Sequence, residues 1–398
     1  MGEPLRYDPY DYAIHEDPYP TYARLREEAP LYHNWERGFW ALSRHADVAA
    51  AFRRTTQLSN RFGVSLDPIA YGPEADKTMS FLAMDPPRHT RMRALVSRGF
   101  TPRRVSDLEN SIRGLAEGHL DAALSGGDGE FDFVSDFAGL IPMDVISEML
   151  GVPQPDRTEL RRLADLIVHR EEGVQDVPPA GIEAAVKLLT YFRELISERR
   201  VQPQPDLTSA LLEAEVDGDR LSDDEITSFL LLLVVAGNET TTKMLANAWY
   251  WAWRFPRVKE RVLGEPADAP RWVEETLRYD NSTQMLARVA SGDLELLGTR
   301  VPDGSPILLL IGSANRDEAV FSNPDAYDTL RDTSKMISFG SGRHFCMGAP
   351  LARLEGKVAL ETLARRVSDY DVDESTASRV HSINVRGFAS LPTAVKTR

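Results

Sequence analysis

Cysteine is nearly absent from this sequence, since Cys346 is the only one among 398 residues. A single cysteine excludes an intramolecular disulfide and suits a reducing compartment, so we expect a cytoplasmic protein. Basic residues are also scarce: 46 Lys and Arg stand against 61 Asp and Glu, which gives a net charge of −15. This acidic balance argues against general nucleic-acid binding.

Long apolar runs and boundary signals are missing as well. The longest apolar run, residues 229–237, is far shorter than the roughly 20 residues that span a bilayer. The start Met1-Gly2-Glu3-Pro4 leads into no apolar leader, so we expect neither a signal peptide nor a membrane anchor. We find no Gly/Ser linker, low-complexity stretch or internal repeat, and we expect one domain over residues 1–398.

Helical periodicity dominates what is present, so the expected fold class is mainly α with small β-sheets. The pattern predicts helices at 19–28, 88–99, 104–124, 136–150, 156–171, 181–199 and 222–254. It predicts short strands around 31–33, 39–42, 285–290, 294–301, 306–311 and 370–395, a long loop at 58–84, a connector at 172–179 and irregular chain at 313–335. The helix at 222–254 is about 45 Å long and apolar nearly all round at 229–237, so it should be buried.

The lone cysteine stands in an unusual run, residues 339–353. Glycines at 340, 342 and 348 allow tight turns around it, and helix formers follow from Pro350. Cys346 therefore lies near a helix N-terminus, where the dipole and free N–H groups favour a negative sulfur. A cysteine hydrolase with His344 as its base is disfavoured, because residues two apart on an extended loop point to opposite sides. A zinc site is disfavoured because there is no second cysteine.

The spacing Phe-Gly-x-Gly-x-His-x-Cys-x-Gly at 339–348 closely resembles the cysteine loop of cytochromes P450. The resemblance extends from Asp17-Pro18-Tyr19-Pro20 to residues 386–392. It implies the cytochrome P450 fold, a triangular helix-rich single domain, with haem b (iron protoporphyrin IX) as cofactor. It also implies Cys346 as the iron ligand and Phe339, Gly340 and Gly348 as further haem contacts.

A second motif lies within the long helix, Ala236-Gly237-Asn238-Glu239-Thr240-Thr241. Glycine weakens a helix, and a threonine hydroxyl can donate a hydrogen bond to a carbonyl one turn back. The pattern therefore indicates a kink in the helix or a local break in its backbone hydrogen bonds. A small-residue packing notch is the alternative. By resemblance this is the oxygen-activating helix, with Thr240 and Glu239 as the catalytic pair that supplies protons and Ala236 against the haem.

Glu275 and Arg278 are three apart on a helix, which by itself indicates an ordinary ion pair. Upstream of the cysteine loop the pair resembles the family's buried Glu-x-x-Arg. The resemblance gives Arg331 as the third member and a structural role to all three.

Two further positions, His89 and Arg93, are four apart and share a helix face, so one anion could meet both. Alone they indicate only a solvated face. By resemblance, His89, Arg93, Arg288 and His344 bind the haem propionates.

The segment 88–104 holds six arginines, one histidine and no acid, a local reversal of the chain's sign. A solvated basic face is one interpretation. The resemblance favours a docking site for a ferredoxin-type electron donor on the proximal face.

By helical spacing, Leu232, Val235 and Ala236 share a face with Thr240, and Leu286 and Val385 match other pocket-lining positions of the family. An apolar pocket suggests a medium to large lipophilic substrate, such as a terpenoid, steroid or polyketide. The implied reaction inserts one oxygen atom from O2 into a C–H bond or alkene, with electrons from ferredoxin and its reductase. A peroxide-driven peroxygenase and a non-enzymatic haem-thiolate ligand sensor are the alternatives.

Overall fold

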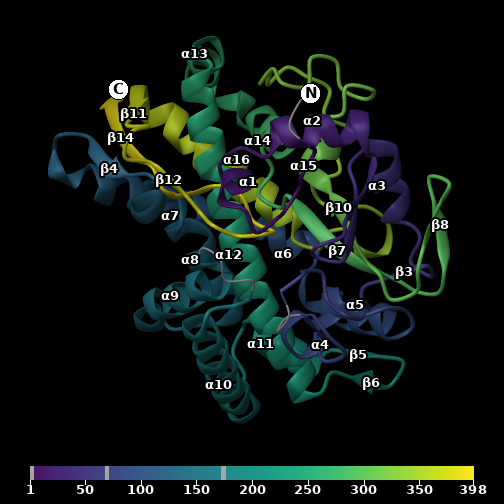
Figure 1. Ribbon diagram of the computed structural model, residues 1–398. Coiled ribbons are helices and arrows are strands. Elements are labelled where there is room, and N and C mark those ends of the chain that lie inside the picture. Colours follow the sequence, from purple (N-terminus) through teal and green to yellow (C-terminus); the bar gives the residue numbers. More distant parts are fainter. Residues whose placement is uncertain (1–3, 68–70, 172–175) are drawn as a thin grey trace.

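Helices form most of the protein, which the computed structural model describes over residues 4–67, 71–171 and 176–398 (Figure 1). The helices are α1 (Tyr12–Glu16), α2 (Tyr19–Glu28), α3 (His45–Ala51), α4 (Asp76–Met79), α5 (Arg88–Gly99), α6 (Pro102–Asp107), α7 (Glu109–Ala123), α8 (Leu140–Leu150), α9 (Arg157–Val168), α10 (Pro179–Val201), α11 (Leu207–Glu213), α12 (Asp223–Arg254), α13 (Pro256–Gly264), α14 (Ala269–Tyr279), α15 (Ile311–Ala314) and α16 (Ala349–Arg366). Single turns are η1 (Ser80–Ala83), η2 (Leu124–Gly126), η3 (Val134–Ala138), η4 (Gln154–Asp156), η5 (Pro266–Asp268) and η6 (Gly342–His344).

The strands form small sheets at the edge of the helical body (Figure 1). They are β1 (Leu31–Asn34), β2 (Phe39–Leu42), β3 (Leu58–Ser59), β4 (Glu130–Asp132), β5 (Glu215–Val216), β6 (Asp219–Arg220), β7 (Met285–Ala290), β8 (Leu294–Leu296), β9 (Thr299–Val301), β10 (Pro306–Leu310), β11 (Val367–Val372), β12 (Ser378–Arg379), β13 (Phe388–Ser390) and β14 (Pro392–Thr397). The largest sheet has the order β1-β2-β10-β7-β3, in which only β10 and β2 are parallel. A second sheet joins β11, β14 and β4.

Helix α12 runs through the middle of the molecule (Figure 1). It begins with the capping box that the sequence predicts, in which Ser222 and Glu225 each accept from the other's backbone N–H. Of the described helices it alone is long and apolar enough to cross a membrane, but 67% of its most apolar window is buried inside the protein. It is therefore the core helix expected from its apolar circumference.

The structure departs from the expected elements in three places. The helix expected at 104–124 is split into α6 and α7, because the N–H of Leu108 turns back to the carbonyl of Val105 and closes the first piece. The expected loop at 58–84 contains β3, α4 and η1. The strand expected at 294–301 is a hairpin, since Leu297 and Gly298 both adopt positive φ (49° and 76°) in its two-residue turn. The connector expected at 172–179 lies partly outside the described residues.

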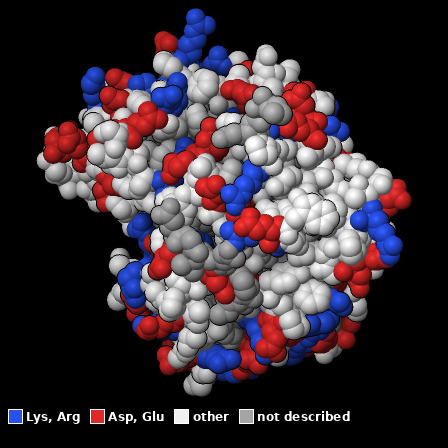
Figure 2. Space-filling view, in the orientation of Figure 1, with Lys and Arg blue, Asp and Glu red and all other residues white. Residues whose placement is uncertain are grey.

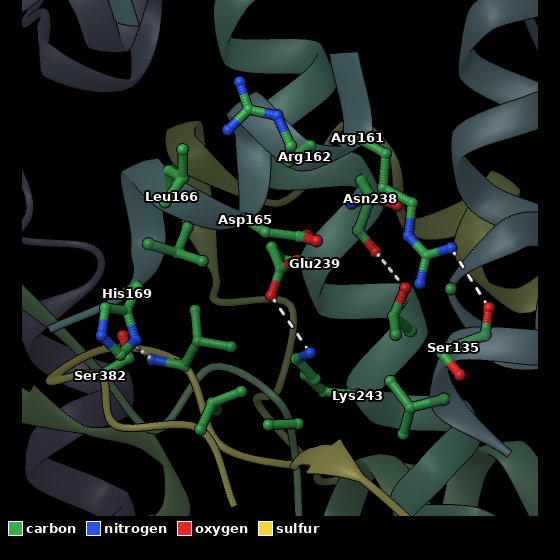
Figure 3. Close-up of a pocket in the computed structure, with 17 residues that line it drawn as sticks. Ser135, Arg161, Arg162, Asp165, Leu166, His169, Asn238, Glu239, Lys243 and Ser382 are labelled. Carbon is green, nitrogen blue, oxygen red and sulfur yellow. Dashed lines mark hydrogen bonds and ion pairs between the residues drawn. The ribbon is translucent and has the colours of Figure 1, made fainter. Parts of the chain in front are cut away.

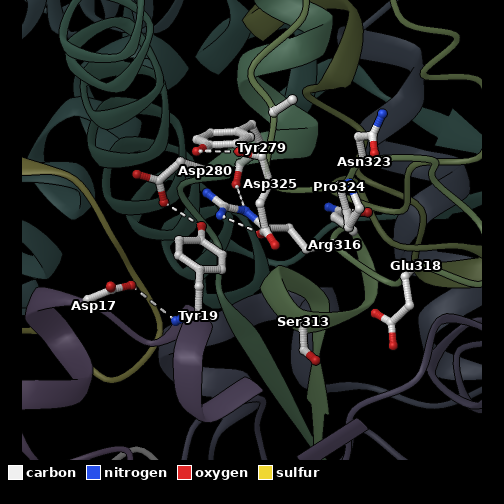
Figure 4. Close-up of polar contacts among 12 residues, drawn as sticks. Asp17, Tyr19, Tyr279, Asp280, Ser313, Arg316, Glu318, Asn323, Pro324 and Asp325 are labelled. Atoms are coloured by element: carbon white, nitrogen blue, oxygen red, sulfur yellow. Dashed lines mark hydrogen bonds and ion pairs between the residues drawn. The ribbon is translucent and has the colours of Figure 1, made fainter. Parts of the chain in front are cut away.

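A buried polar cluster ties the two ends of the chain to the end of α14 (Figure 4). Asp280 accepts hydrogen bonds from the Tyr19 hydroxyl at 2.6 Å, the Trp251 indole at 2.8 Å and the Arg386 guanidinium at 2.8 Å. The guanidinium of Arg316 lies between the Tyr19 ring and a second tyrosine ring, 3.4 and 3.6 Å from their centroids. Because Asp280 is fully buried, these donors hold its charge without help from water.

Candidate active site

The loop before α16 turns where the sequence supplies glycine. Gly340 and Gly342 have φ values of 69° and 72°, which favour glycine over any other residue. A Cβ on Gly342 would lie 3.2 Å from the carbonyl oxygen of Phe52, so space as well as conformation requires glycine there. The N–H of Cys346 donates to the carbonyl of Phe339 at 2.9 Å and closes the loop.

Cys346 follows this turn, two residues before the Gly348 N-cap of α16. Its side chain is exposed, yet it sits deep enough in the protein that burial raises the pKa of its thiol. The N–H groups of Gly348 and Ala349 act in the opposite direction, as the helix N-terminus predicts, and so does Arg93. In the protein alone burial outweighs them, and a cation beside the sulfur would favour the thiolate.

Two imidazoles lie against one another beside the cysteine loop, with their ring planes tilted by 42°. The ring centroids of His89 and His344 are 4.0 Å apart. His89 is 2% exposed, and within the described chain neither of its ring nitrogens has a hydrogen-bond partner. The backbone of Met84 approaches the His344 ring without reaching hydrogen-bond geometry. Buried imidazole nitrogens are normally paired, so these indicate a site for a bound group.

Two guanidinium groups complete this set. Arg288, 2% exposed, donates to the Ala287 carbonyl at 2.7 Å, and Arg93 donates to the Phe345 carbonyl at 2.8 Å. Among the described residues neither guanidinium has an ion-pair partner within 4 Å. Each therefore keeps N–H donors available, since a guanidinium carries five.

Burial and mutual repulsion among these groups shift their pKa values. Burial, with repulsion from Arg93, lowers the pKa of His89 to about 4. Burial, with repulsion from His89, Arg288 and Arg93, lowers the pKa of His344 to about 2. Burial lowers the pKa of Arg288 to about 10, which Asp85 partly offsets. A site with this excess of basic groups favours an anion.

One face of α12 carries accessible surface although the helix crosses the core. Ala236 is exposed while Val234 and Asn238 beside it are 1% exposed. Leu232, Val235 and Thr240 on the same face are half-buried, as are Leu286 on β7 and Val385 near the chain end. Gln284, two residues before Leu286, is buried and donates to the Asn281 carbonyl at 2.8 Å.

The Thr240 hydroxyl donates to the Ala236 carbonyl one turn back, at 2.7 Å, as its position in the helix predicts. Helix α12 is assigned as one continuous helix from Asp223 to Arg254. Glu239 points to a different side of the helix, toward a cavity of about 420 Å³ where it meets Lys243 and Asp165 (Figure 3). The acid and the hydroxyl that the sequence pairs thus face different spaces.

The predicted buried ion-pair triad is assembled. Arg278 donates twice to the Glu275 carboxylate, at 2.7 and 2.8 Å, and the Arg331 Nε lies 3.4 Å from it. Arg278 and Arg331 also donate to carbonyls of the irregular chain, among them that of Ala326 at 3.1 and 3.2 Å. The triad therefore connects α14 to the segment that leads into the cysteine loop.

The basic segment 88–104 is less uniform than its sequence indicates. Arg91 is bound by Asp219 at 2.5 and 2.9 Å and by Glu225 at 2.5 Å, and Arg88 pairs with Asp76 at 2.6 Å. Arg103, in contrast, has a side chain that is 93% exposed. On the face of the molecule drawn in Figure 2, acidic and basic side chains are interspersed. Acids distant in the sequence thus neutralise part of the expected patch.

Sequence reasoning missed two charged neighbours of Glu239. Lys243 is buried one helical turn further on, with its Nζ 3.4 Å from the carboxylate. Asp165 comes from α9, and its carboxyl lies close enough to that of Glu239 for each to shift the other's pKa. Spacing could have suggested Lys243, but nothing in the sequence links Asp165 to α12.

These features define a site in which a cysteine side chain lies beside a cluster of basic groups. Such a site suits a ligand that has both anionic groups and a metal cation. The cytochrome P450 family model matches residues 143–268 and 269–393. A putative cytochrome P450 123 from Mycobacterium tuberculosis is 58% identical over 400 residues, covering 100% of this chain and 99% of its own.

Two solved structures of cytochromes P450 are also similar to this chain. PksS, the cytochrome P450 of the bacillaene polyketide synthase of Bacillus subtilis, matches with a TM-score of 0.89 and 33% identity, over 98% of this chain and 100% of that one. CYP109E1 from Bacillus megaterium in complex with corticosterone matches with a TM-score of 0.84 and 31% identity, over 96% and 99%. The chain belongs to the cytochrome P450 family. It is a monooxygenase, an oxidoreductase whose family binds haem b through a cysteine thiolate.

Proposed function

We propose that Cys346 would bind the iron of a haem b and that His89, His344, Arg93 and Arg288 would hold its propionates. The observation that carries this assignment is the set of imidazole and guanidinium groups beside the cysteine loop that have no carboxylate partner among the described residues. Propionates would accept hydrogen bonds from these groups, and the iron would place a cation beside the sulfur. Phe339, Gly340 and Gly348 would contact the ring, and Ala236 would face it from α12.

When bound, the haem supplies oxygen activation, and the protein supplies position and protons. The exposed face of α12 would present Leu232, Val235 and Ala236 to a substrate, with Leu286 and Val385 opposite. Such an apolar lining suits a medium to large lipophilic molecule. One structural relative is recorded with corticosterone and another belongs to a polyketide synthase, which supports a substrate of steroid or polyketide type.

Thr240 and Glu239 would deliver protons during oxygen activation, and the Glu275–Arg278–Arg331 triad would hold the cysteine loop in shape. Electrons would come from a ferredoxin-type donor that docks near Arg103. These roles describe insertion of one oxygen atom from O2 into a C–H bond or alkene.

Replacing Cys346 by serine tests the ligand assignment with little change in side-chain size. We expect the variant to lose the thiolate-type spectrum of the reduced carbon-monoxide complex, because no other cysteine exists in the chain. Retention of that spectrum would overturn the assignment.

The reaction type is tested with the wild-type protein. Product formed with NADPH, a surrogate ferredoxin and its reductase supports the monooxygenase. Product formed with hydrogen peroxide alone would identify a peroxygenase, and no product with either would favour a ligand sensor.

A further inference from the structure

A cavity lies beside α12 and is lined there by Asn238, Glu239 and Lys243. It occupies about 420 Å³ between α9, α12 and residues 380–389 (Figure 3). Arg162, Asp165 and His169 are exposed, whereas Glu239 and Lys243 are buried, so the cavity leads from solvent past Asp165 to the side of the core helix. Its volume is large enough to hold several waters.

Two carboxyl groups meet at this cavity. Glu239 of α12 and Asp165 of α9 point toward one another (Figure 3), and their carboxyl groups lie close enough to shift each other's pKa. Adjacent carboxylates cannot both ionise without strong repulsion, so such a pair retains a proton. The ammonium of Lys243, 3.4 Å from Glu239, favours the charged form at Glu239 and leaves the proton on Asp165.

The pKa shifts have the directions that this geometry requires. Burial and the neighbouring Glu239 raise the pKa of Asp165 to about 7. Burial also acts to raise the pKa of Glu239, but Lys243 and the neighbouring carboxyl of Asp165 outweigh it, and the net shift is downward. Both directions place the shared proton on Asp165.

A third polar group, the side chain of Asn238, indicates that the cavity is suited to water rather than to apolar side chains. Asn238 lines it, is 1% exposed, and its side-chain oxygen has no hydrogen-bond partner among the described residues. A buried amide oxygen without a protein partner is normally satisfied by water. Water would thus reach the cavity wall one residue from Glu239.

The charged lining contains further groups that set the pair's titration. Helix α9 contributes Arg161 and Arg162, with His169 just beyond its end, and α12 contributes Lys243. Arg162 is already paired with Glu159 at 2.7 Å, and the Arg161 guanidinium donates to the Ser135 carbonyl at 3.3 Å. The lining residues from 380–389 are not titratable, and α10, packed on α9, contributes none. The cations favour loss of the shared proton, which keeps it exchangeable.

We propose that Asp165 is a further member of the proton supply, sharing a proton with Glu239 and exchanging it with water in this cavity. The step breaks the O–H bond of Asp165 and forms one on Glu239, and a cavity water then returns a proton to Asp165. The inference rests on the proposed role of Glu239 and Thr240. It adds an acid from α9, which approaches α12 only through the tertiary fold.

The variant Asp165→Asn removes the titrating oxygen but keeps the size and one hydrogen-bonding oxygen. In the holoenzyme we expect product formation to fall by up to about 10²-fold, the lower end of what positioned proton transfer contributes, with a larger solvent isotope effect. The wild-type rate should fall as pH rises through about 7, because Asp165 then loses its proton, and this inflection should vanish in the variant. Asp165→Glu should restore it in part.

The matched control is Glu194→Gln on α10, which removes an exposed carboxylate outside the cavity lining. It should leave the rate, isotope effect and pH profile unchanged. Equal effects from both variants, or a wild-type pH profile in Asp165→Asn, would overturn the proposal and leave Asp165 as a structural link between α9 and α12.

An infrared titration of the ferric holoenzyme reads the proton directly. The difference between wild type and Asp165→Asn should contain a protonated-carboxyl band that disappears as pH rises through about 7. Glu355, whose pKa burial raises to about 8, contributes equally to both proteins and cancels. Absence of the band would overturn the proposal. Thr240→Ala with unchanged product per NADPH would instead refute the threonine's role while leaving the infrared result intact.

Discussion

Replacing Asp280 by asparagine should destabilise the protein through the cluster that joins the chain's two ends. The carboxylate is fully buried and accepts from Tyr19, Trp251 and Arg386. Attraction to Arg386 and to Arg379, together with hydrogen bonds from Tyr19 and Trp251, outweighs the burial that acts to raise its pKa. These interactions lower the Asp280 pKa from 3.8 to about 2.

Each pKa unit corresponds to about 1.4 kcal/mol, so the shift contributes about 2 kcal/mol to the free energy of unfolding. Losing one member of a buried ion pair costs more, roughly 3–5 kcal/mol, because the remaining charge has no partner. We therefore expect Asp280→Asn to lower the free energy of unfolding by about 2–5 kcal/mol at pH 7. The folded pKa lies below the unfolded one, so this stabilisation is complete above pH 3.8 and is lost as pH falls toward 2.

Urea unfolding followed by tryptophan fluorescence at pH 7 and pH 5 measures the difference, which should be the same at both. Below about pH 4 it should shrink, because wild-type Asp280 is then being protonated. Asp325→Asn is the control, since that carboxylate also bonds a buried arginine, Arg316, but is itself 76% exposed. It should cost less than about 1 kcal/mol. Equal stability of Asp280→Asn and wild type, or a difference that grows in acid, would refute the reasoning.

Two further predictions concern turnover and electron delivery. Thr240→Ala should still bind substrate and consume NADPH while diverting reducing power to peroxide or water. Thr227→Ala removes an equivalent hydroxyl bond on the same helix and should leave product per NADPH unchanged. Reversing Arg103 and Arg104 to glutamate should slow the first electron transfer at low salt without altering substrate binding, because exposed charges act mainly on encounter and the Debye length is about 10 Å at 0.1 M. Transfer that shows no salt dependence in the wild type would place the donor elsewhere.

The sequence by itself determined the fold class and the position of the cysteine loop. Both are local properties: the glycines at 340 and 342 permit the positive φ values that the loop requires, and the capping box at Ser222 starts the core helix. The pairing of Glu275 with Arg278 is also local, because residues three apart share a helix face. Family spacing added Arg331, which the fold then brings to the same carboxylate.

Tertiary packing decided what local spacing could not. Glu239 and Thr240 are neighbours in sequence, but the helix turns them toward different spaces, so only the fold reveals that Glu239 meets an acid of α9. Arg91 of the expected basic patch is paired with Asp219, which lies on a hairpin distant in the sequence. The pKa of Cys346 is likewise set by how much protein surrounds it rather than by the helix behind it. Electrostatic interactions depend on distance and burial in three dimensions, and a linear pattern encodes neither across separate elements.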